Sequence, residues 1–114
     1  STTQQTPEQA QVLTGSTSGV LVGNSGGTYS YYVLEYPGNN EDVMITMNYA
    51  PANSTTVNGM GFAVYKPNGR TIQSQPVNTP GQRTATISAS DAGRYLIQVY
   101  NYINQVPMQY TLTR

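Results

Sequence analysis

The side chains able to perform acid-base or nucleophilic chemistry are few in this sequence. It contains no histidine and no cysteine, which excludes Ser-His and Cys-His pairs and also imidazole and thiolate metal ligands. The adjacent carboxylates Glu41 and Asp42 would point to opposite faces of an extended strand, so they could not converge on a substrate. We therefore expect a protein that is not an enzyme, with no catalytic residue and no cofactor.

Asp91 could in principle be a metal ligand, but a structural role explains it better. Calcium prefers about six to eight oxygen ligands, and no acidic cluster surrounds Asp91 in the sequence. Asp91 and Gly93 form a polar turn that leads into Tyr95, the first inward residue of a strand that alternates along Tyr95, Ile97 and Val99. This pattern resembles the tyrosine corner of β-sandwiches, in which the phenol hydroxyl bonds upstream backbone. We predict a structural corner at Asp91, Gly93 and Tyr95 and no metal site.

Tyrosines are the most informative side chains, since the chain has ten of them and only 9% charged residues. Period-two alternation leaves several of these rings, with two aliphatic neighbours, on outward strand faces. Contiguous apolar groups on a sheet face mark an interface or a binding surface, although ordinary cross-strand packing remains the alternative. The candidate interface residues on these faces are Tyr31, Val33, Tyr65, Leu96, Tyr100 and Tyr102. The five cationic residues are scattered, so no nucleic-acid partner is expected.

The elements that position these residues are short strands separated by turns rich in Gly, Pro and Asn. Period-two runs without helical periodicity predict an all-β fold, an antiparallel two-sheet β-sandwich of about eight strands. Residues 72–77 are expected to form a weak edge strand because Pro76 cannot donate to a ladder. The expected core includes Ile45, Phe62, Ile97, Val99 and Leu112.

Residues 1–18 are predicted to be an extended N-terminal tail before a sandwich domain at residues 19–114. The tail is polar and has little to bury beyond Ala10, Val12 and Leu13. We expect it to pair with a sheet edge of a neighbouring copy, with Ala10 and Val12 facing the core. Such a head-to-tail contact would build a filament.

The composition is typical of an extracellular bacterial module, so we expect a secreted or cell-surface protein. No apolar run reaches the length of a membrane-spanning helix, and no membrane insertion is expected. Asn53 begins an Asn-Ser-Thr sequon and is a possible glycosylation site.

Four segments in this order resemble one bacterial family, the pre-peptidase C-terminal domain. They are Gly-Thr-Tyr-Ser-Tyr-Tyr-Val-Leu-Glu-Tyr-Pro-Gly at 27–38, Gly-Phe-Ala-Val-Tyr-Lys-Pro-Asn-Gly at 61–69, Gly-Arg-Tyr-Leu-Ile-Gln-Val-Tyr at 93–100 and Gln-Tyr-Thr-Leu at 109–112. The resemblance covers residues 19–114 and implies a jelly-roll-like β-sandwich, related to collagen-binding modules of clostridial collagenases and appended to secreted proteases.

The sequence departs from that family at two points. Family members commonly carry Asp beside the strand before the Pro-Asn-Gly turn, where this chain has Gly61 and Ala63. Collagen-binding relatives hold calcium with acidic residues near their start, and the tail of this chain has only one acidic residue, Glu8. An immunoglobulin-like sandwich would also accommodate the corner at Asp91, but its Cys-Trp-Cys core is missing.

Two functions remain open from the sequence. The first is a non-catalytic structural protein that self-associates, as a homo-oligomer or homopolymer, through the tail and the outward tyrosines. The alternative is a binding module for an extracellular protein or polysaccharide, appended to a secreted peptidase or other hydrolase. We expect the tail to be held in place by a sheet edge, and this expectation favours the self-associating structural protein.

Overall fold

The computed structural model describes residues 7–54 and 56–114. Regular structure consists of one short 3₁₀ helix and ten strands, two of which have only two residues. They are η1 (Pro7–Gln9), β1 (Gln11–Val12), β2 (Ser16–Val22), β3 (Thr28–Tyr36), β4 (Val43–Ala50), β5 (Met60–Tyr65), β6 (Thr71–Gln73), β7 (Gln75–Pro76), β8 (Gln82–Ile87), β9 (Gly93–Asn101) and β10 (Pro107–Thr113).

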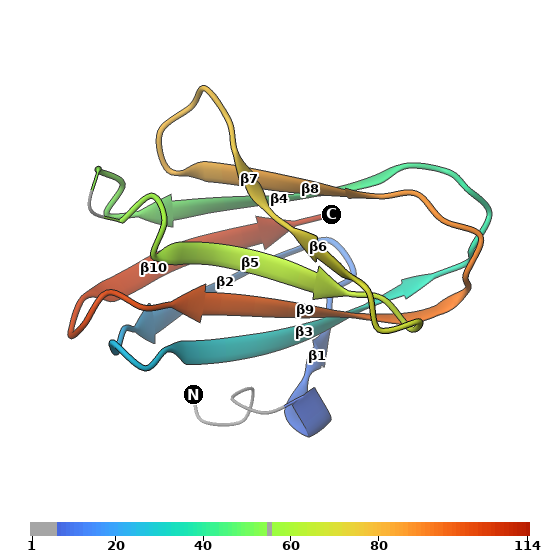
Figure 1. Cartoon of the computed structure of the whole chain (residues 1–114), viewed down its shortest axis with the longest axis horizontal. Helices are drawn as coiled ribbons and strands as arrows, with labels where there is room; N and C mark the ends of the chain where they lie inside the picture. Colours follow the sequence, from blue (N-terminus) through green and yellow to red (C-terminus); the bar gives the residue numbers. More distant parts are fainter. Residues whose placement is uncertain (1–6, 55) are drawn as a thin grey trace.

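The strands form two stacked five-stranded sheets (Figure 1). Sheet A has the order β1-β3-β9-β5-β6, and sheet B has the order β2-β10-β4-β8-β7. Every described strand pair is antiparallel except β1 with β3, which is parallel. The predicted all-β, two-sheet sandwich is therefore confirmed.

Alternating side chains of both sheets fill the space between them. The five residues expected in the core, Ile45, Phe62, Ile97, Val99 and Leu112, are all fully buried. Two buried tyrosines join the sheets, because the hydroxyls of Tyr32 on β3 and Tyr110 on β10 lie 2.6 Å apart. Burial is the main reason that the pKa of Tyr110 lies well above its usual value.

The segment predicted as one edge strand at residues 72–77 is divided between the two sheets. β6 pairs with β5 in sheet A, and β7 pairs with β8 in sheet B, so the chain changes sheets at Ser74 (Figure 1). Ser74 is fully buried; its N–H donates to Phe62 O at 3.0 Å and its hydroxyl accepts from Phe62 N–H at 3.1 Å. Both bonds hold Ser74 to β5 of sheet A at the point where the chain leaves that sheet, which alternation alone does not reveal.

The described part of the segment before residue 19 pairs with its own chain and not, as expected, with a neighbouring copy. β1 lies beside β3, and Leu13 N–H donates to Val33 O at 2.8 Å. The inward residue is Leu13, which is 2% exposed, whereas Val12 is 44% exposed and Ala10 is half-buried. The larger side chain takes the core position, which shifts the alternation by one residue from the expected register. Residues 1–6 of the predicted tail lie outside the described residues, and β2 already begins at Ser16.

The corner before β9 has the geometry that its motif predicts. The Tyr95 hydroxyl donates to Asp91 O at 2.7 Å, and Tyr95 is fully buried. Gly93 has a φ of 142°, a backbone conformation that favours glycine. The Asp91 carboxylate accepts a hydrogen bond from Asn68 Nδ2 at 3.2 Å, which connects this turn to the β5–β6 turn.

Candidate functional site

The outer face of sheet A carries a cluster of tyrosine and glutamine side chains, which we call the tyrosine face. Strand register sets its rows: Tyr29 lies opposite Tyr100, and Tyr31 lies opposite Gln98. Tyr65 lies across from Leu96, and Tyr102 follows the end of β9. We define the tyrosine face as Tyr29, Tyr31, Tyr65, Gln73, Gln98, Tyr100 and Tyr102.

Hydrogen bonds hold these side chains in fixed positions. Gln98 accepts from the Tyr65 hydroxyl at 3.1 Å and donates to the Tyr31 hydroxyl at 2.9 Å. Gln73 Nε2 donates to the Tyr100 hydroxyl at 2.6 Å. Gln98 links β9 to its neighbours β3 and β5, and Gln73 reaches across β5 from β6 to β9. The face therefore offers a pre-ordered array of phenols and amides to a ligand.

The tyrosine rings also contact one another at the end of the face near Tyr102. The Tyr29 and Tyr102 rings meet edge to face with centroids 5.9 Å apart, and their hydroxyls lie 2.8 Å apart. Tyr100 and Tyr102 have ring centroids 5.5 Å apart. The hydrogen bond to Tyr29, together with partial burial, raises the pKa of Tyr102 to about 12. This phenol is therefore neutral near pH 7 and serves as a hydrogen-bonding group, not as a nucleophile.

One small residue on β5, Ala63, lines a polar hollow in this face. Gly61 lies opposite Tyr100, and Ala63 lies between Gln98 and Gln73 in the register. Where larger side chains would cover the strand, a hollow of about 420 Å³ opens instead. Its lining is formed by Asn58, Ala63, Tyr65, Thr71, Gln73, Arg83, Gln98, Tyr100 and Tyr102. Ala63, one of the two positions where the resembled family commonly carries Asp, thus lines a hollow here.

The candidate interface residues on sheet A share its outer face, but their exposure differs from expectation. Tyr102 is 41% exposed and Tyr65 and Leu96 are half-buried, whereas Tyr31, Val33 and Tyr100 are buried. The buried members are covered by their own neighbours: β1 pairs alongside Val33, and the glutamines bond the tyrosine hydroxyls. Ala10 and Val12 lie apart, on the segment that pairs with β3.

Sequence reasoning missed four contributors to this site. Tyr29, Gln98 and Gln73 follow the same alternation as the predicted residues and could have been included by extending it. Arg83 could not have been found in this way, because it comes from β8, a strand of sheet B, and not from a strand of the tyrosine face.

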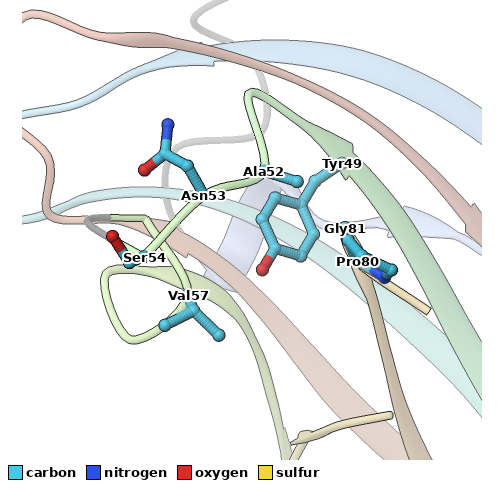
Figure 2. Close-up of a pocket in the computed structure, with 7 residues that line it drawn as sticks. All are labelled: Tyr49, Ala52, Asn53, Ser54, Val57, Pro80 and Gly81. Atoms are coloured by element: carbon cyan, nitrogen blue, oxygen red, sulfur yellow. The ribbon is translucent and has the colours of Figure 1, made fainter. Parts of the chain in front are cut away.

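A second hollow of about 420 Å³ lies at one end of the sandwich, between the loop after β4 and the turn before β8 (Figure 2). Its lining is Tyr49, Ala52, Asn53, Ser54, Val57, Pro80 and Gly81. Figure 2 shows the Tyr49 ring within it, between Ala52 and Pro80. Its lining is mainly apolar and it lacks a cluster of oriented polar groups, so it is a weaker candidate than the tyrosine face.

Asn53, the possible glycosylation site, lies in the loop after β4. It is exposed, and its Oδ1 accepts from Thr56 N–H at 3.2 Å. The sequon's Thr55 lies outside the described residues, and glycosylation stays a prediction.

The adjacent carboxylates considered for catalysis, Glu41 and Asp42, are not part of the tyrosine face. Glu41 and Asp42 are exposed in the turn before β4, and Glu35 pairs with Arg94 at 3.2 Å on the surface. Within residues 7–54 and 56–114, no group of three or more His, Cys, Asp or Glu residues could hold a metal ion. The described part of the chain also has no helix that could cross a membrane.

Comparison with known proteins identifies the fold. No family model matches the sequence, and no curated protein matches it. The structure is similar to the crystal structure of the pre-peptidase C-terminal domain of a collagenase from Bacillus anthracis, with a TM-score of 0.55 and 19% sequence identity. The match covers 90% of this chain and 89% of that chain. The predicted likeness to the pre-peptidase C-terminal fold is therefore confirmed.

Proposed function

We propose that this chain is a non-catalytic accessory module that binds an extracellular protein or polysaccharide through the tyrosine face. The observation that carries the proposal is the pre-ordered array of phenols and amides around a polar hollow. Tyrosines bury large areas with few rotors to freeze, and fixed polar groups orient a ligand.

The fold supports an accessory role for a secreted hydrolase. The similar domain belongs to a collagenase, and a sandwich of this kind could serve a secreted enzyme as an attachment module. The low charge and the many hydroxyl and amide side chains fit a protein that works outside the cell. The raised pKa of Tyr102, which keeps its phenol protonated, and the dispersed carboxylates favour binding over catalysis.

Binding to insoluble polymers tests the proposal. The purified chain is mixed with denatured collagen, elastin, chitin or cellulose, and depletion from solution is measured. Tyr65→Ala combined with Tyr102→Ala should weaken binding by more than about fivefold, equivalent to about 1 kcal/mol. The matched control combines Val20→Ala with Met44→Ala, since both side chains are more than half exposed on sheet B. Equal binding by the tyrosine variant, or binding to none of these polymers, would contradict the proposal.

Self-association remains a second candidate, favoured now by a sheet edge and no longer by the tail. β2 is the edge strand of sheet B, has seven residues and carries no charge. Uncharged edges of this length can pair with another copy. Light scattering across a concentration range should then show a dimer or larger homo-oligomer, and Val20→Lys should dissociate it. A monomer at all concentrations would remove this candidate.

A further inference from the structure

Arg83 is a buried cation without an anionic partner in the described part of the chain. Its exposed fraction is 6%, and its guanidinium donates to three neutral oxygens. Nε donates to Ser74 Oγ at 2.9 Å, Nη2 to Ser74 O at 2.6 Å, and Nη1 to Val57 O at 2.7 Å. The ion pair found among residues 7–54 and 56–114 is Arg94 with Glu35, on the surface.

These bonds give Arg83 a structural role but do not neutralise it. They tie β8 to Ser74, where the chain changes sheets, and to the loop before β5. An arginine stays protonated in proteins, and a buried charge is costly without a counter-charge. Hydrogen bonds to neutral oxygens offset only part of the cost of burying this charge. An anion would therefore bind more favourably here than at an exposed arginine.

The guanidinium can be reached from the tyrosine face. Arg83 lines the polar hollow, and each of its two terminal nitrogens has a second N–H beyond the described bonds. Gly61 lets these groups come close to β5: a Cβ there would lie 2.7 Å from Arg83 Nε and 2.6 Å from the Tyr100 hydroxyl. Any larger residue at this position would occupy the space between these groups.

We propose that Arg83 binds a carboxylate of the ligand, and that this carboxylate is a glutamate side chain of an extended polypeptide. The inference rests on the proposed function and names its ligand chemistry. Planar guanidinium groups match carboxylates, and the neighbouring Tyr100 hydroxyl, which accepts from Gln73 Nε2, can donate its own proton to the same anion. Reach favours glutamate, because its carboxylate ends a flexible chain of two methylenes. A uronic acid holds its carboxylate directly on a ring, which is too wide to approach an almost fully buried guanidinium.

The test uses two matched blocked peptides, acetyl-Gly-Gly-Glu-Gly-Gly-amide and its Gln counterpart, with digalacturonate as the saccharide probe. Binding is followed by the NMR shift of the Arg83 Nε–H resonance. The Glu peptide should bind at least about tenfold more tightly than the Gln peptide. Equal affinity of the two peptides, or tighter binding of digalacturonate than of the Glu peptide, would overturn the proposal.

The variant Gln73→Glu keeps the test independent of the structural role of Arg83. Gln73 is exposed on β6, and the new carboxylate would accept from the Tyr100 hydroxyl beside the guanidinium. We expect it to supply the missing counter-charge and abolish the preference for the Glu peptide, while Arg94→Gln, at an exposed arginine, retains it. A preference unchanged in Gln73→Glu would place the anion elsewhere and overturn the proposal.

The two proposals fail in different ways. If polymer binding depends on Tyr65 and Tyr102 but the peptides show no Glu preference, the carboxylate site is wrong and the binding module stands. If the peptides show the preference but no polymer binds, the site stands and the proposed function falls.

Discussion

The Tyr95 hydroxyl reaches back four residues to donate a hydrogen bond of 2.7 Å to the main-chain oxygen of Asp91. The Tyr95 ring also packs against Tyr36, with centroids 5.2 Å apart, and Tyr36 accepts from Ala89 N–H through its own hydroxyl. The strand entry at β9 is thus held by two tyrosines whose hydroxyls bond backbone groups from different parts of the chain.

Tyr95→Phe should lower the free energy of unfolding by about 1 to 3 kcal/mol, because the Asp91 carbonyl loses its partner while the ring still fills the core. Urea denaturation measures the change. Tyr29→Phe is the control, since it deletes a hydroxyl that bonds at the surface. An unfolding midpoint equal to that of the parent chain would show that the corner bond contributes nothing.

Leu13→Ala should destabilise the domain by about 2 to 5 kcal/mol, because it removes a side chain that is 2% exposed. The neighbouring Val12→Ala is the control, and it should change stability little because Val12 is 44% exposed. Denaturation at several protein concentrations completes the test. A midpoint that rises with concentration would mean that the segment pairs between copies after all.

Ser74→Ala should destabilise by about 2 kcal/mol or more, since it leaves two buried donors, Phe62 N–H and Arg83 Nε–H, without their acceptor. Ser88→Ala serves as the control, because the Ser88 hydroxyl bonds Asn40 O at an exposed position. Thermal unfolding followed by circular dichroism compares the two. Similar melting temperatures for both variants would refute the role assigned to Ser74.

Alkaline pH should weaken the fold between pH 10 and about pH 12. The folded state raises the pKa of Tyr102 from 10.0 to about 12, so folding favours the neutral phenol. This contribution is complete below pH 10 and is lost as the pH rises through the folded-state value. Ultraviolet difference titration should show phenols that ionise late in the native chain and near pH 10 in urea. Tyr102→Phe should reduce by one the number of phenols that ionise above pH 10 in the native chain. A titration curve unchanged in that range would contradict the assignment of the raised pKa to Tyr102.

Period-two alternation predicted most of this fold because a sheet with one buried face imposes that period on its sequence. The core residues Ile45 and Phe62 and the outward tyrosines followed from it directly. Alternation failed at Ser74, where the chain passes from sheet A to sheet B. A change of sheet depends on backbone hydrogen bonds, which leave no periodic pattern in the sequence. Alternation also placed Val12 in the core position that Leu13 occupies, because a two-residue strand is too short to reveal its own register.

The sequence predicted the sheet face on which the candidate site lies, but not the amide and guanidinium groups that take part in it. Alternation placed the tyrosines on one face, but their exposure depends on the amides of Gln73 and Gln98, which come from other strands. Arg83 belongs to the other sheet, and only the stacking of the sheets brings it to Gly61. Contacts of this kind join residues far apart in sequence and leave no local pattern.

The pairing of β2 with β10 places Ser16 directly opposite Thr113, and Arg114 N–H donates to Gly15 O at 2.9 Å. The entrance and exit of the sandwich are therefore cross-strand partners, about 5 Å apart. A fusion partner or label attached after Arg114 would therefore emerge beside Gly15, in the turn between β1 and β2. A circularly permuted module for engineering would need a linker from Arg114 to a residue before β1, because joining Thr113 directly to Ser16 would leave out the core residue Leu13.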